Sequence, residues 1–226
     1  MKYDKKLNLL IAQNVDVNYQ KFHAKNVPNI AVKGVRIPVL RKIAKEFSVC
    51  EDFLENVTLN NYEAISVACY YIGATTHDGD TLKIRLAQIL PYVNNWAICD
   101  TFVSSLKMLK TTKKTTVYPL IMNYLNSDND YTVRFGVVCL LSYYLEPEVI
   151  DEIFAKIVLL QGRGYYLDMA LAWLISEAFV KCRQQTLDLL KSKTLSQFVQ
   201  NKSIAKICDS FRVSDADKLL VKQYRV

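Results

Sequence analysis

Apolar residues recur along this chain with the spacing of one face of an α-helix, and the few glycines and prolines fall between these periodic segments. No segment shows the strict alternation of apolar and polar positions that is typical of a strand. The pattern therefore predicts an all-α chain. Its helices are expected at about residues 3–20, 37–47, 61–74, 80–90, 96–109, 115–125, 131–145, 148–160, 165–181, 183–191, 196–211 and 215–223.

The predicted helices also fall into pairs. From WAICDTFVSSLKML onward, each pair begins roughly 35 residues after the last, close to the period of HEAT and related helical-hairpin repeats. Stacked pairs would form a HEAT-like helical-repeat solenoid, an α-α superhelix whose concave face is lined by one helix of each pair. Because the repeat is degenerate, an irregular helical bundle is the alternative. We expect residues 1–226 to form one such domain.

The composition restricts the class of protein further. About half of the 226 residues are hydrophobic, which excludes a disordered chain, yet no apolar run approaches the roughly 18 residues of a membrane span. The N-terminal MKYDKKLNLL carries charges within its apolar pattern and does not resemble a signal peptide. We expect a soluble, cytoplasmic protein without a membrane partner, and we expect a monomer.

The cysteines and histidines suggest no metal site. The six cysteines stand singly among aliphatic residues without a C-x-x-C pair, so we interpret them as small buried hydrophobes. His23 and His77 are too few and too far apart for a metal cluster, and we expect both at the surface. We expect neither a metal nor another cofactor.

The net charge is +7 and the isoelectric point is about 9.0. A basic excess on a folded domain points weakly to a polyanion, most often nucleic acid. Many proteins this basic bind none, so charge by itself decides nothing.

Four unusual side chains lie on the first helices of successive pairs. Trp96 and Asp100 stand four residues apart, which stacks them on one face of a helix. Arg134 and Trp173 lie on the first helices of the next two pairs. Each alone has an ordinary explanation: core packing for the tryptophans, an ion pair for Arg134 and a solvated helix position for Asp100. Together, on one class of helix, they favour a shared site.

Several blocks of the chain resemble the AlkD-type DNA alkylation-repair family. The similarity covers nearly the whole chain, in order. It is carried by GVRIPVLRKIAKEF (34–47), the WAICD helix, the YTVRFGVV helix, YYLDMALAWLISEAFVK and the closing KSIAKICDSFRVSDADK. The resemblance implies a HEAT-like repeat DNA glycosylase that removes N3- and N7-alkylated purines from double-stranded DNA held in the concave face. It also implies that the family's catalytic tryptophan and aspartate correspond to Trp96 and Asp100, and that Trp173 and Arg134 belong to the site.

The implied chemistry suits these residue types. An alkylated purine already carries positive charge and leaves readily, so the barrier lies in the oxocarbenium character that grows on the sugar. The Asp100 carboxylate would stabilise that cation and orient the attacking water. The indoles of Trp96 and Trp173 would pack against the deoxyribose and face the cationic base, and Arg134 would hold a flanking phosphate.

Two positions depart from the family pattern. Ser176 stands one turn after Trp173, where the pattern has an arginine, and VPNIAVKG (27–34) reads as a loop where active members place a further helix. The alternative is therefore a non-catalytic helical-repeat module that binds DNA or another acidic partner.

Basic residues on the expected concave face would replace counterions of the duplex under either hypothesis. The candidates are Lys33, Arg36, Arg41, Arg134, Lys202, Lys206 and Arg212.

Overall fold

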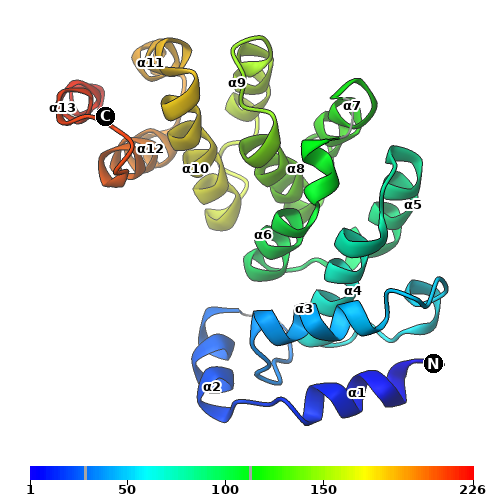
Figure 1. The fold of residues 1–226 in the computed structure, drawn as a ribbon. Coiled ribbons are helices and arrows are strands. Elements are labelled where there is room, and N and C mark those ends of the chain that lie inside the picture. Colours follow the sequence, from blue (N-terminus) through cyan, green and yellow to red (C-terminus); the bar gives the residue numbers. More distant parts are fainter. Residues whose placement is uncertain (28–29, 112–113) are drawn as a thin grey trace. The chain divides into compact units, whose positions relative to one another are not determined.

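The computed structural model describes residues 1–27, 30–111 and 114–226. Within these ranges the chain forms thirteen α-helices, three short 3₁₀ helices and no strand, which confirms the predicted all-α class (Figure 1). Its contacts divide it into an N-terminal unit, Met1–Val117, and a C-terminal unit, Tyr118–Val226. The prediction of one domain over residues 1–226 stays a prediction.

The N-terminal unit contains six complete α-helices. They are α1 (Asp4–Ala12), α2 (Val17–Asn26), α3 (Ile37–Glu46), α4 (Tyr62–Thr75), α5 (Gly79–Ile89) and α6 (Trp96–Ser105), with 3₁₀ helices η1 (Leu54–Asn56), η2 (Leu90–Tyr92) and η3 (Lys107–Lys110). Helix α7 (Lys114–Tyr124) contains the boundary between the units. The C-terminal unit continues with α8 (Asp130–Tyr143), α9 (Ile150–Val158), α10 (Tyr165–Lys181), α11 (Arg183–Ser192), α12 (Gln197–Asp209) and α13 (Asp215–Lys222).

The helix pairs repeat with the predicted period. Helices α4 and α6 begin 34 residues apart in the N-terminal unit, and α8, α10 and α12 begin 35 and 32 residues apart in the C-terminal unit. In the first unit α4 packs against both α3 and α6, and in the second α10 packs against both α8 and α12. First helices thus stack on first helices, as in a helical-repeat protein. The same period extends to the pair α4 and α5, which precedes the first of the predicted repeats.

The predicted single helix at residues 3–20 is wrong. The chain leaves helical geometry after α1, and Asp16 starts α2 as its N-cap by accepting a hydrogen bond from the backbone N–H of Tyr19 at 2.9 Å. Helix α2 then extends to Asn26, beyond the predicted end. Of the predicted loop 27–34, Pro28 and Asn29 lie outside the described residues, and the remaining positions are not helical.

The first helices form the core of each unit. Every residue of α4 from Tyr62 to Ile72 is buried, as is every residue of α8 from Val133 to Leu141. A helix buried on all sides lies inside a stack. Cys69, Cys99, Cys139 and Cys182 are buried, which confirms their prediction as small hydrophobes, whereas Cys50 and Cys208 are only partly buried. None of the described helices is long and apolar enough to cross a membrane.

Candidate active site and nucleic-acid interface

Helix α6 carries Trp96 and Asp100 on its open face. Asn95 caps the helix by accepting a hydrogen bond from the backbone N–H of Ile98 at 3.0 Å. The opposite face, which includes Ile98 and Phe102, is fully buried in the unit where α6 packs on α4. Trp96 and Asp100 are half-buried and one helical turn apart, so the predicted sharing of a face holds.

The Trp96 indole also holds the end of α2. Its Nε1 donates a hydrogen bond to the backbone carbonyl of Asn26 at 3.0 Å. Asn26 is the last residue of α2, so its carbonyl has no partner within the helix. A helix therefore does end beside Trp96, although the sequence predicts none between residues 20 and 37.

His23 also fixes helix α2 and is only 7 % exposed. The expectation that His23 lies at the surface is wrong, because its ring stacks on Tyr19 and meets the edge of Tyr62, with centroids 5.1 and 4.6 Å apart. Burial lowers the pKa of His23. The residue is therefore a neutral packing element of α2, whereas His77 is exposed as expected.

The loop that leads into α3 is held by a carboxylate that the sequence reading missed. Glu63 is fully buried on α4 and accepts hydrogen bonds from the backbone N–H groups of Lys33 at 2.9 Å and Gly34 at 2.7 Å. Gly34 has a φ of +98°, which favours glycine. The only signal in the sequence is a glutamate within the otherwise apolar run YEAISVACYYIGAT.

Arg134 lies inside the C-terminal unit, on α8. It is 6 % exposed, and its Nη1 donates a hydrogen bond to the backbone carbonyl of Tyr166 in the first turn of α10. Together with Tyr131 and Tyr165 it lines a small pocket of about 100 Å³. The guanidinium thus lies where α8 and α10 begin.

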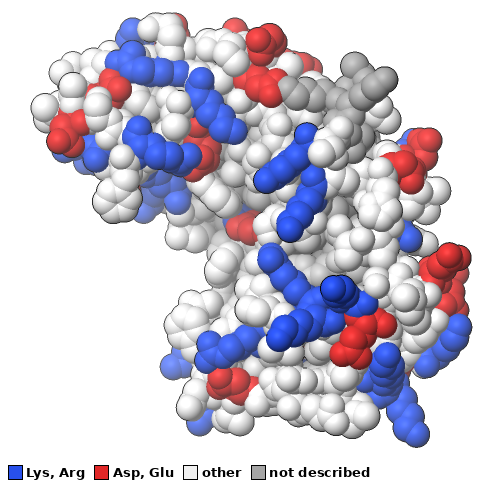
Figure 2. All heavy atoms as spheres, in the orientation of Figure 1, with Lys and Arg blue, Asp and Glu red and all other residues white. Residues whose placement is uncertain are grey.

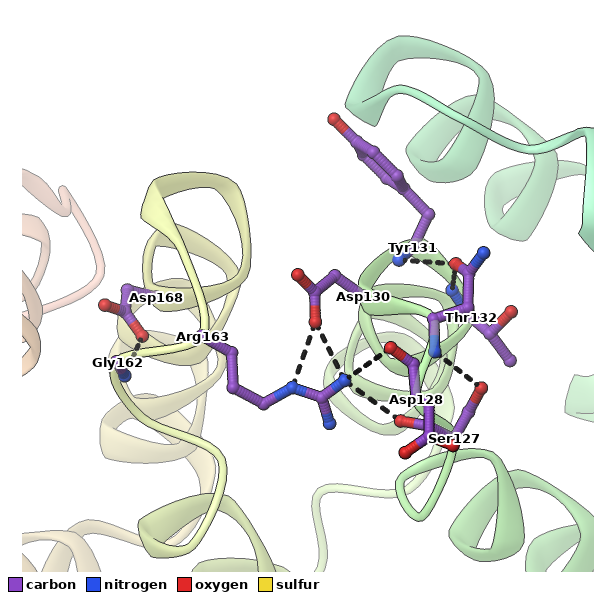
Figure 3. Close-up of polar contacts among 9 residues, drawn as sticks. Ser127, Asp128, Asp130, Tyr131, Thr132, Gly162, Arg163 and Asp168 are labelled. Atoms are coloured by element: carbon purple, nitrogen blue, oxygen red, sulfur yellow. Dashed lines mark hydrogen bonds and ion pairs between the residues drawn. The ribbon is translucent and has the colours of Figure 1, made fainter.

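A network around Arg163 joins the loops that precede α8 and α10 (Figure 3). The guanidinium of Arg163 pairs with the Asp130 carboxylate at 2.8 Å and donates to the carbonyls of Ser127 and Asp128 at 3.0 Å each. The backbone N–H of Gly162 donates to Asp168 at 3.0 Å. These contacts fix the first turns of α8 and α10, between which Arg134 is held.

Trp173 lies on α10 and is half-buried. Its backbone carbonyl accepts a hydrogen bond from the hydroxyl of Ser176 at 2.8 Å, and Ser176 itself is 7 % exposed. Trp173 and Arg134 belong to the C-terminal unit, and Trp96 and Asp100 to the N-terminal unit. The convergence of all four stays a prediction.

A family model described as DNA alkylation repair enzyme matches residues 3–207 of the 226. The chain belongs to the DNA alkylation repair enzyme family. Membership confirms the resemblance drawn from the sequence blocks and assigns this chain to DNA alkylation repair, with DNA as the partner that such a role requires. No curated protein and no solved structure gave a match.

The predicted phosphate contacts of this DNA alkylation repair protein fall into two groups. Arg36 forms an ion pair with Asp16 at 2.7 Å, and Arg212 forms one with Glu177 at 2.6 Å. The hydrogen bond that Arg212 donates to the Glu177 carboxylate raises the pKa of Arg212. These two guanidinium groups already have counterions within the protein.

Four of the other cationic candidates form no ion pair within the described part of the chain: Lys33, Arg41, Lys202 and Lys206. Arg134 is held by its contacts at the start of α10. Lys33 and Lys202 are exposed, Lys206 is half-buried, and the ammonium of Lys202 lies 5.8 Å from the ring centroid of Phe198. Arg41 on α3 is exposed. In the N-terminal unit, Lys and Arg side chains gather over α3 (Figure 2). This gathering fits the DNA contact expected of a DNA alkylation repair protein.

Proposed function

We propose that the chain excises N3- and N7-alkylated purines from double-stranded DNA by hydrolysing the N-glycosidic bond. The observation that carries this proposal is the pair Trp96 and Asp100, half-exposed and one turn apart on the open face of α6, in a chain of a DNA alkylation repair family. An indole beside a carboxylate supplies a packing surface for a sugar and a negative charge for a cation.

The base needs little protonation by a general acid before it leaves, because the alkylated base is already cationic. As the C1′–N bond breaks, its electron pair leaves with the base, which becomes neutral, and positive charge develops on the deoxyribose. The Asp100 carboxylate stabilises that charge. Water then attacks C1′, and its proton passes to Asp100 or to solvent.

The remaining residues position the strand. Trp96 packs against the deoxyribose, and its bond to the Asn26 carbonyl keeps the indole and α2 together beside the lesion. Trp173 presents a second electron-rich face to the cationic base. Arg134, fixed at the start of α10, contacts a flanking phosphate.

The test is the release of a single modified base. A duplex with one N7-methylguanine is incubated with the protein, and abasic sites are revealed as strand breaks after alkali. We expect breaks at the modified position well above the spontaneous depurination measured without protein. The same duplex with unmodified guanine is the control, and breaks at spontaneous level with every N3- and N7-alkylpurine would contradict the proposal.

One observation favours a non-catalytic DNA-binding module instead. Ser176 is buried and its hydroxyl is bonded to the carbonyl of Trp173, so it offers no phosphate contact where the family pattern has an arginine. Under this alternative the modified duplex is bound and no abasic sites form. Measuring binding on the same duplex therefore separates the two functions.

A further inference from the structure

A pocket of about 360 Å³ lies within the N-terminal unit, where the C-terminal halves of α3, α4 and α6 meet. Its volume falls in the lower part of the range of roughly 300–1,000 Å³ that is typical of ligand sites. Gly73 and Ala74 of α4 form its small-residue wall. Three cations line it, one of them after the end of α6: Arg41, Lys45 and Lys107.

Arg41 is held in place over this pocket. Its Nη2 donates a hydrogen bond to the hydroxyl of Ser104 at 3.1 Å, and its guanidinium lies 5.3 Å from the ring centroid of Tyr70. Tyr70 is 3 % exposed, so its ring is a fixed platform. A guanidinium that is already ordered loses less conformational freedom when it binds an anion.

The positive charge of the pocket is not neutralised by the protein. In the described part of the chain, no carboxylate lies within ion-pair distance of Arg41, Lys45 or Lys107, and the residues that line the pocket include none. This distinguishes the pocket from Arg36 and Arg212, each of which has a carboxylate partner. Three cations with hydroxyl groups between them suit a phosphate group.

The pocket shares the open face of α6 with the proposed catalytic residues. Trp96, Asp100 and Ser104 follow one another at intervals of four residues. One helical turn, a rise of roughly 6 Å, therefore separates Asp100 from the residue that anchors Arg41. A phosphate held here would lie close to the sugar that Asp100 faces.

We infer that this pocket binds a phosphate group. The phosphate belongs to the backbone of the strand that carries the lesion, and this part of the inference rests on the proposed function. Arg41 and Lys107 contact the phosphate oxygens and Lys45 supplies a further positive charge. The pocket then sets the position of the strand relative to Asp100.

The first experiment measures binding of the full chain to a fluorescently labelled, unmodified duplex over a range of salt concentrations. Lys45→Ala and Lys107→Ala should each weaken binding about five- to tenfold near 0.1 M salt and reduce the salt slope by about one, since each removes one positive charge that neutralises the bound phosphate. Lys42→Ala and Lys83→Ala are matched controls. Lys42 is exposed on the same helix as Lys45 but does not line the pocket, and Lys83 is exposed on α5. Both should stay within about twofold of the wild type.

The second experiment uses inorganic phosphate as the probe. Thermal unfolding of the wild type in phosphate is compared with unfolding in chloride at the same ionic strength, where a bound anion raises Tm. Arg41→Ala should abolish the difference. If phosphate protects the wild type but not Arg41→Ala while duplex binding is unchanged in Lys45→Ala and Lys107→Ala, the pocket binds a phosphate group from a source other than the duplex backbone.

The inference is overturned if the pocket variants match Lys42→Ala and Lys83→Ala on the duplex and phosphate has no specific effect on Tm. Its failure is separate from that of the proposed function. Abasic sites without any pocket effect would leave the glycosylase standing and remove the phosphate site. If the pocket variants weaken binding but no abasic sites form, the phosphate site stands and the proposed glycosylase function fails.

Discussion

Asp100 is the residue on which the proposed chemistry depends. A carboxylate about 4 Å from the developing cation, at an effective dielectric constant near 20, contributes roughly 4 kcal/mol. Losing it corresponds to about a thousandfold in rate. Asp100→Asn should therefore nearly abolish base release in single-turnover excision assays, while leaving DNA affinity unchanged or slightly stronger because one charge that repels phosphates is gone. Excision within about threefold of the wild type would remove the catalytic role of Asp100.

Arg134→Ala is the contrasting variant for that assay. Because Arg134 is proposed to contact a phosphate in both the ground and transition states, its removal should weaken binding and excision together. The substitution also removes the hydrogen bond from Nη1 to the Tyr166 carbonyl, so the folding of the variant is checked by circular dichroism. An Arg134→Ala protein that folds and binds DNA normally but excises the base slowly would contradict the proposed contact of Arg134 with a phosphate in the ground state.

His23 should make stability depend on pH. Burial lowers the pKa of His23 in the folded protein, whereas the unfolded chain has the ordinary value of about 6.5. The unfolded state therefore binds more protons below about pH 6.5, and stability should fall as the pH is lowered from about 7.5 to 5. Urea unfolding at several pH values measures this, and His23→Phe should flatten the profile while exposed His77→Gln leaves it unchanged. An identical profile in His23→Phe would contradict the assignment.

At the scale of elements, α12 is the covering layer of the C-terminal unit. It packs along α10 and buries Val199, Ile204 and Ile207. Since α10 is buried between α8 and α12, ending the chain at residue 195 should expose an apolar face, and the fragment 1–195 should aggregate. Size-exclusion chromatography with circular dichroism measures this.

A shorter truncation is the control for that prediction. Fragment 1–211 loses α13, whose only buried residue is Val221, so it should stay largely soluble. A monomeric 1–195 fragment that retains the helicity of its remaining elements would show that α12 and α13 form an independent tail and not a terminal repeat.

At the scale of the whole molecule, DNA binding should depend steeply on salt. Arg36 and Arg212 already have carboxylate partners, and the predicted contacts that form no ion pair in the described part of the chain are Lys33, Arg41, Lys202 and Lys206. With roughly four to six phosphate contacts, the slope of log affinity against log salt should be about −4 to −5. Fluorescence anisotropy on an unmodified duplex gives this slope. A value near zero would exclude nucleic acid as the partner.

The sequence by itself determined the features that depend on local spacing. The apolar period predicts the helices from residue 37 onward, and the interval of roughly 35 residues predicts the stacking of first helices. The four-residue step from Trp96 to Asp100 places both on one face of α6, because helix geometry fixes that relation without any tertiary contact. The break between α1 and α2 is also local, at the cap of Asp16, and the apolar period across residues 3–20 concealed it.

Tertiary structure decided which polar groups meet. Asp16 neutralises Arg36 and Glu177 neutralises Arg212, pairings that join residues 20 and 35 positions apart. Glu63 holds a loop 30 residues away, and the pocket beneath Arg41 draws its cations from segments near the ends of α3 and α6. The charge of a side chain is written in the sequence. Whether that charge is neutralised by a neighbouring side chain or stays available for a ligand depends on distances that only the packed helices set.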